Sequence, residues 1–414
     1  MSQQPRRVLM VAYHFPPVAG SSGIQRTLRL VQHLPALGWQ PLVLTASVRA
    51  YERTSPDLEG DVPNGTVVRR AFALDSARHL ALLGRYPKAL ARPDRWMTWR
   101  FDAVRHGLTM VRQLRPQAIW STYPIATAHV IGAELQRRTG LPWIADFRDP
   151  MAQDGYPEDP VTWRHFERIE RRAVLAAACS TFTTPSAAAD YRERYPQAAG
   201  RIHLLENGYD DPSFAGVCGD EAPLVPGAVT LVHSGVIYPS ERDPTQLMIA
   251  LRRLHEAGRI TPERLRLRFR APVSVELLES LAVKHDVGAY IELLPPVPYR
   301  VALKEMQAAD GLLVMQASNC NAQIPAKVYE YIRAGRPTLG LTDLAGDTAD
   351  VLRRAGFTHL APLESADAIA QILERFLADL AAGRAPLARD EVVRSSSRHA
   401  RSEAFAQLLE SVIQ

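Results

Sequence analysis

The sequence is poor in cysteine and has no long apolar run. Its three cysteines, Cys179, Cys218 and Cys320, are scattered and odd in number. They predict neither a disulfide framework nor a metal cluster, and they favour a reducing compartment. No apolar run reaches the ~18–20 residues that a membrane-spanning helix needs. The basic N-terminal stretch has no apolar core or cleavage site of the kind that a signal peptide carries. We therefore expect a cytoplasmic protein.

Short repeats, low-complexity segments and the common cofactor motifs are also missing. The chain has no Gly-x-Gly-x-x-Gly loop, no His/Cys ligand spacing and no Asp-x-Asp pair in a nucleotide-binding context. We expect neither a metal ion nor a tightly bound cofactor.

What is present is an ordinary globular composition, spread over more than one domain. The chain has 414 residues, 46% of them hydrophobic and 22% charged. At roughly 100–200 residues per domain, this length predicts two or three domains.

Apolar runs alternate with amphipathic stretches along most of the chain, which predicts parallel α/β sheets. The first half should contain strands near 6–17, 40–46, 117–122, 142–149, 180–186 and 201–210, and helices near 23–39, 126–140 and 162–178. The second half repeats this pattern with strands near 229–237, 265–272, 290–296, 311–316 and 337–343, and helices near 243–258, 274–288, 298–310 and 325–335.

This order predicts two Rossmann-like, doubly wound domains with ligands at the carboxyl ends of their strands and a site in the cleft between them. We place the N-terminal domain at 1–210, a proline- and glycine-rich linker at 211–228, and the C-terminal domain at 229–395. The remaining stretch, 396–414, predicts a C-terminal helix that docks on one of the two domains, with packing back on the N-terminal domain as one of the two arrangements.

A basic segment stands out in the N-terminal half. Residues 69–115 hold ten arginines and one lysine against three aspartates, so this segment alone carries +8 in a chain whose total is +5. Aromatic residues interleave with the arginines, among them Trp96, Trp99 and Phe101. The pattern fits an anionic membrane surface, a solvated helical face or nucleic acid. Nucleic acid is the weakest of the three, because no nucleic-acid-binding module accompanies the segment.

The stretch IPAKVYEYIRAGRP, residues 324–337, raises a question of charge. Pro325 suits the first position of a helix, which places Lys327 in a first turn whose free N–H groups attract anions. A bound diphosphate would make that lysine favourable, and Glu330 one turn later could accept hydrogen bonds from a ribose. The alternative from spacing alone is a solvent-exposed Lys327 that pairs with Glu330.

The same stretch resembles the nucleotide-sugar motif of the GT-B-fold glycosyltransferases, retaining family 4 in particular. The pattern Pro-x-Lys-x-x-Glu-Tyr-x-x-Ala-Gly-x-Pro is matched by Pro325, Lys327, Glu330, Tyr331, Ala334, Gly335 and Pro337. The segments at 13–45, 146–150 (DFRDP), 206–210 (ENGYD) and 233–244 (HSGVIYPSERDP) resemble such enzymes of bacterial polysaccharide synthesis in the same order.

The resemblance implies roles for individual residues. Lys327 would contact the donor diphosphate, Glu330 the ribose, and Arg242 would neutralise the leaving group beside Gly235. Gln323 and Val328 complete the expected donor-binding set. The alternative for Arg242 is a surface arginine paired with Glu241 or Asp243.

Two positions depart from the family pattern. Ala322 stands where many members have a glutamate that faces the sugar, and Val236 stands where many have an arginine. Asn319, Asn321 or Gln323 can replace the glutamate as a hydrogen-bonding partner of the sugar.

The N-terminal half should hold the acceptor. The loop PPVAGSSGIQR contains Gly20 and Gly23, His14 lies in the last part of the first expected strand, and Tyr123 follows the strand expected near 117–122. Arg148 and Asp149 stand where many members have a histidine, so we expect Asp149 to orient or deprotonate an acceptor hydroxyl. The alternative is a structural ion-pair network of Asp146, Arg148 and Asp149. His129 is a further candidate of the cleft, although lone histidines are more often structural.

These features favour a metal-independent transfer of a sugar from a nucleotide-diphosphate-sugar to a glycan or polyprenyl-linked glycan acceptor. The resemblance implies that the transfer retains the anomeric configuration. In that hypothesis residues 69–115 rest on the inner membrane surface, and nucleic acid is no partner. A sugar-nucleotide epimerase and a non-catalytic subunit of the same fold are the alternatives.

Overall fold

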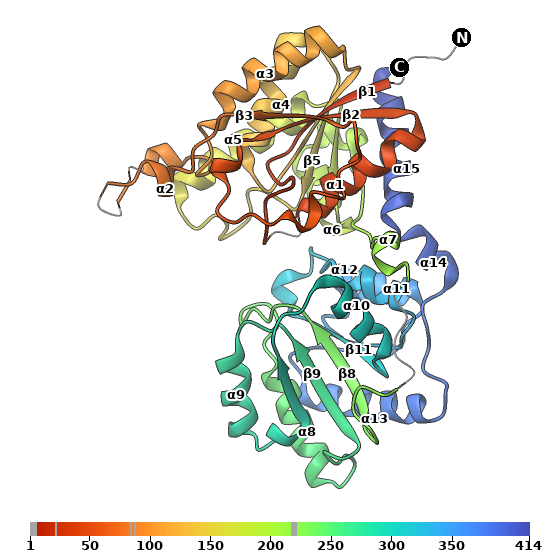
Figure 1. The fold of residues 1–414 in the computed structure, drawn as a ribbon. Helices are drawn as coiled ribbons and strands as arrows, with labels where there is room; N and C mark the ends of the chain where they lie inside the picture. Colours follow the sequence, from red (N-terminus) through yellow and green to blue (C-terminus); the bar gives the residue numbers. More distant parts are fainter. Residues whose placement is uncertain (1–5, 21–22, 83–84, 87, 217–221) are drawn as a thin grey trace. The chain divides into compact units, whose positions relative to one another are not determined.

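The computed structural model describes residues 1–414 except 1–5, 21–22, 83–84, 87 and 217–221 (Figure 1). The chain divides into two compact units. The N-terminal unit comprises residues 1–206 together with 398–414, and the C-terminal unit comprises 207–397. Among the described residues, no helix is long and apolar enough to cross a membrane.

The N-terminal unit is built on a sheet of seven parallel strands in the order β3-β2-β1-β4-β5-β6-β7. The five inner strands are almost continuously buried, as expected of a parallel sheet that is covered on both faces. The strands are β1 (Arg6–Val11), β2 (Trp39–Ala46), β3 (Val67–Ala71), β4 (Ala118–Thr122), β5 (Trp143–Arg148), β6 (Cys179–Phe182) and β7 (Ile202–Leu204).

Helices cover both faces of this sheet (Figure 1). One face carries α3 (Trp99–Leu114), α4 (Ala126–Thr139), α5 (Pro160–Ala176) and α6 (Pro185–Arg194). The other carries α1 (Gly23–His33) and the C-terminal helix α15 (Arg398–Ile413), which buries Phe405 and Leu409 against the strands. A four-residue helix, α2 (Ser76–His79), lies in the loop before α3.

A buried ion pair joins the helices to the strand ends of this unit. The Arg26 guanidinium on α1 donates to both carboxylate oxygens of Asp146 on β5, at 2.8 and 2.7 Å. The same carboxylate accepts the hydroxyls of Thr122 and Thr181, each at 2.7 Å. Burial opposes ionisation, yet Arg26 and these hydroxyls hold the pKa of Asp146 below its usual value.

The C-terminal unit has a second parallel sheet, of six strands in the order β10-β9-β8-β11-β12-β13. The strands are β8 (Val229–Ser234), β9 (Leu265–Arg270), β10 (Ile291–Leu294), β11 (Gly311–Gln316), β12 (Thr338–Thr342) and β13 (Leu360–Ala361). One face packs against α8 (Thr245–Glu256), α9 (Val275–Lys284) and α13 (Ala366–Ala381), and the other against α10 (Tyr299–Ala308), α11 (Lys327–Ala334) and α12 (Asp347–Ala355).

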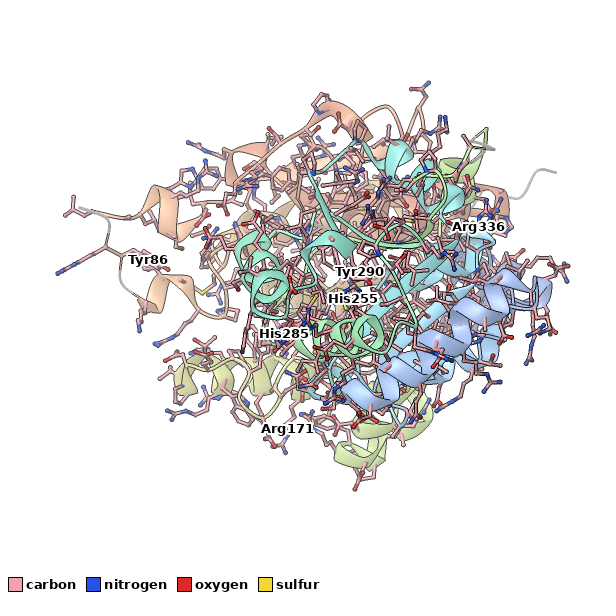
Figure 2. The ribbon with its side chains drawn as sticks, turned by 90° about the horizontal axis from the view of Figure 1, so that it is seen from below. Tyr86, Arg171, His255, His285, Tyr290 and Arg336 are labelled. Carbon is pink, nitrogen blue, oxygen red and sulfur yellow. The ribbon has the colours of Figure 1, made fainter. Side chains whose placement is uncertain are left out.

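Short elements complete the C-terminal unit. They are α7 (Asp211–Phe214) and α14 (Asp390–Ser395). His255 on α8 and Tyr290 before β10 lie beside each other in Figure 2, with His255 Nδ1 2.8 Å from the Tyr290 hydroxyl. This bond ties a covering helix to the edge of the sheet.

The prediction of two doubly wound parallel sheets is confirmed, and three of its details are corrected. The helix predicted at 23–39 ends at His33, where Pro35 enters a separate turn. The strand predicted at 180–186 ends at Phe182, because Thr184 caps α6 and Pro185 begins it. The linker predicted at 211–228 starts with α7, which Asp210 caps, and its residues 217–221 lie outside the described part.

Replacing Arg26 by methionine should lower the free energy of unfolding by about 3–5 kcal/mol, because the Asp146 charge would stay buried without its cation. Urea unfolding measures this loss. Arg137→Met is the matched control, since Arg137 pairs with Glu134 on the exposed surface of α4 and should change stability little. Equal effects of the two substitutions would contradict a structural role for the buried pair.

Candidate active site

The helix α11 places Lys327 as its first residue, after β11 and close to the end of β8. Pro325 precedes the helix by two residues, so its predicted place inside the helix is wrong. Its carbonyl accepts the Val328 N–H at 2.9 Å. Gly335 ends α11 in the left-handed region, at φ 69°.

The Lys327 ammonium does not lie free in solvent. Its Nζ is 2.9 Å from Nε2 of His233, a fully buried residue of β8. His233 Nδ1 lies 2.9 Å from the Leu313 carbonyl, which can only accept, so Nδ1 carries the proton and Nε2 accepts from the lysine. Burial and the adjacent lysine hold the pKa of His233 well below its usual value, so the imidazole is neutral.

Lys327 sits in a cationic environment. Burial of its ammonium group and the nearby charge of Arg242 lower the pKa of Lys327 to about 7, against a smaller opposing effect of Glu330. The positive charges of Lys327 and Arg242 are therefore only partly offset by nearby carboxylates. An arriving diphosphate would supply further negative charge and restore the lysine proton.

Gly235 shapes the space beside the lysine. It follows β8 at φ 107°, and a Cβ at this position would lie 3.3 Å from Lys327 Nζ. The neighbouring Ser234 N–H donates to the Tyr331 hydroxyl at 2.9 Å, which anchors the strand end to α11. Glycine thus serves here both for its backbone conformation and for close approach.

Arg242 is a mostly buried side chain, 13% exposed. Its Nη1 donates to the Val236 carbonyl at 3.1 Å and the guanidinium lies 5.2 Å from the centre of the Tyr238 ring. Glu241 is 3.8 Å away, so the expected alternative of a pair with that residue is present but long. A pair with Asp243 is not formed, because that carboxylate instead accepts the Thr245 N–H and hydroxyl at the start of α8.

Glu330 is oriented by a residue that the sequence analysis did not single out. The Tyr299 hydroxyl on α10 donates to Glu330 Oε1 at 2.6 Å. Tyr299 is 42% exposed. A flat aromatic side chain next to a carboxylate suits a nucleoside.

The residues expected near the sugar differ in whether their side chains already have hydrogen-bond partners. Asn319 donates to the Ser240 carbonyl at 2.8 Å and Asn321 to Asp343 Oδ2 at 2.6 Å, so both tie loops together. Gln323 is exposed, and its side-chain amide makes no bond among the described residues, which leaves it as the amide available to a ligand. The Val328 side chain is fully buried in the core.

In the N-terminal unit, the expected acceptor-side residues collect at the ends of three adjacent strands. His14 follows β1, Tyr123 follows β4, and Arg148 and Asp149 end β5. Burial, with the charge of Arg148, lowers the pKa of His14 to about 4. Gly20 is exposed at φ 78°, whereas Gly23 is buried as the first residue of α1. Ser21 and Ser22 between them lie outside the described residues.

Arg148 occupies a strained position for a non-glycine residue, at φ 63°. Its Nη1 donates to the Tyr123 carbonyl at 3.2 Å, and its carbonyl accepts the Thr183 N–H and hydroxyl. Burial raises the pKa of Asp149, while Arg148 opposes that rise. A raised carboxylate pKa suits a general base.

Two expectations for this half are corrected. Asp146 does not form the expected ion-pair network with Arg148 and Asp149, because it pairs with Arg26 instead. His129 does not join the strand ends. It is buried on α4, where its ring packs 4.8 Å from that of Phe147.

Comparison with known proteins places these residues in a family context. Residues 22–208 match the glycosyl transferase 4-like domain. No curated protein matches the sequence. Within the described part of the chain, no group of three or more His, Cys, Asp or Glu residues could hold a metal ion.

Several solved structures resemble the whole chain. Sucrose-phosphate synthase from Thermosynechococcus elongatus has 15% identity and a TM-score of 0.66, and the match covers 98% of both chains. Anabaena HepE in complex with UDP-glucose has 13% identity, a TM-score of 0.66 and coverage of 98% and 99%. The trehalose 6-phosphate synthase of Burkholderia multivorans has 16% identity, a TM-score of 0.65 and coverage of 98% and 97%. Residues 22–208 therefore resemble a glycosyltransferase domain, and the whole chain has the GT-B fold.

Gly235→Ala should weaken binding of a nucleoside diphosphate by about tenfold or more, because the new methyl group would sit in front of Lys327 Nζ. Gly258→Ala is the control. Gly258 also has a positive φ, 67°, but nothing lies within 4 Å of its would-be Cβ. Both positions have a positive φ, 107° at Gly235 and 67° at Gly258, so the control shows what an alanine at positive φ does where no group lies nearby. Titration calorimetry measures the affinity of each variant. Equal affinities of the two variants would contradict the close approach.

Proposed function

We propose that this glycosyltransferase moves a sugar from a uridine-diphosphate sugar to a hydroxyl group of a glycan or lipid-linked glycan. The observation that carries the proposal is the cluster of Lys327, His233, Gly235 and Arg242 at the end of β8. It presents two basic side chains and an open glycine where a diphosphate would fit. HepE, which shares the fold, was solved with UDP-glucose, and this supports uridine as the base.

In this proposal Lys327 and Arg242 stabilise the charge that develops on the departing diphosphate. His233 holds the lysine at one end by accepting a hydrogen bond, so it is a positioning residue. Glu330, oriented by Tyr299, accepts from the ribose hydroxyls. Because these side-chain cations neutralise the leaving group, transfer should proceed without a metal ion.

The acceptor hydroxyl would be oriented by Asp149 and Arg148, with His14 and Tyr123 nearby. We propose retention of the anomeric configuration, in keeping with the resemblance to family 4. Ala322 removes one carboxylate from the sugar side, and the exposed amide of Gln323 is the side chain that would replace it.

We also propose that the basic segment 69–115 contacts an anionic membrane surface, where a lipid-linked acceptor would be found. Of its described residues, Phe72, Leu82, Leu90 and Phe101 expose large apolar side chains next to arginines. Apolar groups interleaved with cations are what such a surface binds. Residues 83, 84 and 87 lie outside the described part.

The purified chain should release UDP from UDP-glucose or a related donor, and Lys327→Ala and Glu330→Gln should each lower that rate by about 10²-fold or more. Lys284→Ala is the matched control, because Lys284 is an exposed lysine of the same unit on α9. Sugar analysis without acceptor separates transfer from epimerisation. Tight UDP binding with no turnover on any donor or acceptor would indicate a non-catalytic subunit instead.

Donor affinity should fall as the pH rises above 7. The free Lys327 ammonium has a pKa of about 7, and a bound diphosphate would raise it, so binding above pH 7 requires uptake of a proton. The affinity should then drop by up to about tenfold per pH unit and level off below pH 7. Calorimetric titration with UDP-glucose, in buffers of different ionisation enthalpy, measures both effects. Lys327→Met should abolish the pH dependence, and a flat wild-type profile would contradict the assignment.

A further inference from the structure

A basic cavity of about 490 Å³ lies on the helical face of the N-terminal sheet, among α3, α4, α5 and the turn Lys88–Ala91. Four arginines line it: Arg92, Arg100, Arg168 and Arg172. Its other lining residues include two histidines and several apolar side chains, and no carboxylate is among them. None of the residues assigned above to the donor or acceptor takes part.

The arginines of this cavity are only partly neutralised by the protein. Arg92 pairs with Asp159 at 2.9 Å, and Arg172 has a long pair with Glu134 at 3.9 Å. Among the described residues, no carboxylate lies within ion-pair distance of Arg100 or Arg168. Repulsion among these arginines destabilises the cavity when no anion is bound. A guanidinium group can donate two parallel hydrogen bonds to the oxygens of a phosphate group.

The buried ring of His129 is one of the groups that line the cavity. Its Nδ1 is 2.8 Å from the Ser121 hydroxyl, whose oxygen already accepts the Trp143 indole N–H. Among the described residues, Nδ1 is the acceptor within reach of the Ser121 hydroxyl proton, so that proton goes to Nδ1 and the ring proton is on Nε2. That buried Nε2 has no hydrogen-bond partner in the described part of the chain, although buried polar atoms normally have one.

A second hollow of about 480 Å³ continues the first, because both are lined by Arg100, Val130 and Arg172. It adds the apolar side chains of Phe101, Val104 and Leu108, along with further arginines and the single carboxylate Glu134. Phe101 is 63% exposed. A phosphate site that opens onto an apolar strip suits an amphipathic anion better than a free ion.

We propose that the cavity among α3, α4 and α5 binds the phosphate group of an anionic lipid, with the apolar strip along Phe101 and Leu108 against its chain. The inference rests on the proposed membrane contact of residues 69–115 and adds a discrete site to it. It does not depend on the donor chemistry of the C-terminal unit.

The test is binding of dioctanoyl phosphatidic acid below its micelle concentration, with dioctanoyl phosphatidylcholine and inorganic phosphate as comparison ligands. The double variant Arg100→Gln/Arg168→Gln should bind the phosphatidic acid at least about tenfold more weakly. The control, Arg112→Gln/Arg171→Gln, removes two charges from the same helices outside both hollows (Arg171 is labelled in Figure 2). Unchanged UDP-glucose binding and unfolding midpoint show that each variant is folded.

The possible results separate the two proposals. Saturable binding that is lost only in the Arg100/Arg168 variant supports the site. An equal loss in both variants overturns the site and leaves a diffuse surface attraction. Inorganic phosphate that binds as tightly as the lipid overturns the lipid assignment. A wild-type protein that binds neither the phosphatidic acid nor vesicles of phosphatidylglycerol at low salt would overturn both the lipid site and the proposed membrane contact. The transferase proposal is tested independently, by UDP-glucose turnover.

Discussion

The geometry of the N-terminal strand ends depends on the buried pair between Arg26 and Asp146. A buried carboxylate destabilises the fold unless a cation neutralises its charge and hydrogen-bond donors satisfy its oxygens. The Asp146 carboxylate is neutralised by the Arg26 guanidinium and accepts hydrogen bonds from the hydroxyls of Thr122 and Thr181. The Asp146 carbonyl also accepts the Tyr123 N–H at 3.0 Å. Immediately beyond, the register between β5 and β6 shifts and Arg148 turns to positive φ. A fixed strand followed by an irregular turn is what presents Arg148 and Asp149.

The C-terminal unit uses a different principle. There the protein leaves a charge incompletely matched instead of satisfying it. Lys327 has a neutral histidine on one side and the cation Arg242 nearby, and Gly235 keeps the space beside it open. Repulsion between these cations destabilises the site when it is empty, and a bound anion removes that repulsion. The same logic applies to the arginine cavity of the N-terminal unit, which has no carboxylate in its lining.

Much of the fold could be predicted from periodicity, because central strands such as Val229–Ser234 are short apolar runs between helical patterns. The strand β3 escaped prediction because Arg69 and Arg70 interrupt its apolar character at the sheet edge. The helix α3 was not predicted as a separate element, because arginines and other polar residues lie between the buried Trp99, Ala103 and Met110 and obscure their helical spacing.

At the candidate site, the motif indicated Lys327, Glu330 and Gly235, but it could not indicate how they are held. His233 lies 94 residues before Lys327, and only the pairing of β8 with β11 brings its ring to the Leu313 carbonyl and the lysine. Spacing also did not indicate that the phase of α11 turns the Val328 side chain into the core. Linear spacing does not reveal a hydrogen-bond partner from another strand.

The docking of α15 has a consequence for biosynthesis. Arg401 on this helix pairs with Glu206 at 2.7 Å, and Phe405 and Leu409 close one apolar face of the N-terminal sheet. The C-terminal unit is thus inserted, in sequence, between two parts of the N-terminal one. During translation the part of that face beneath α15 stays uncovered until residues 398–414 have been made, although the strands are made first. The N-terminal unit can therefore be completed only after the C-terminal unit has been synthesised.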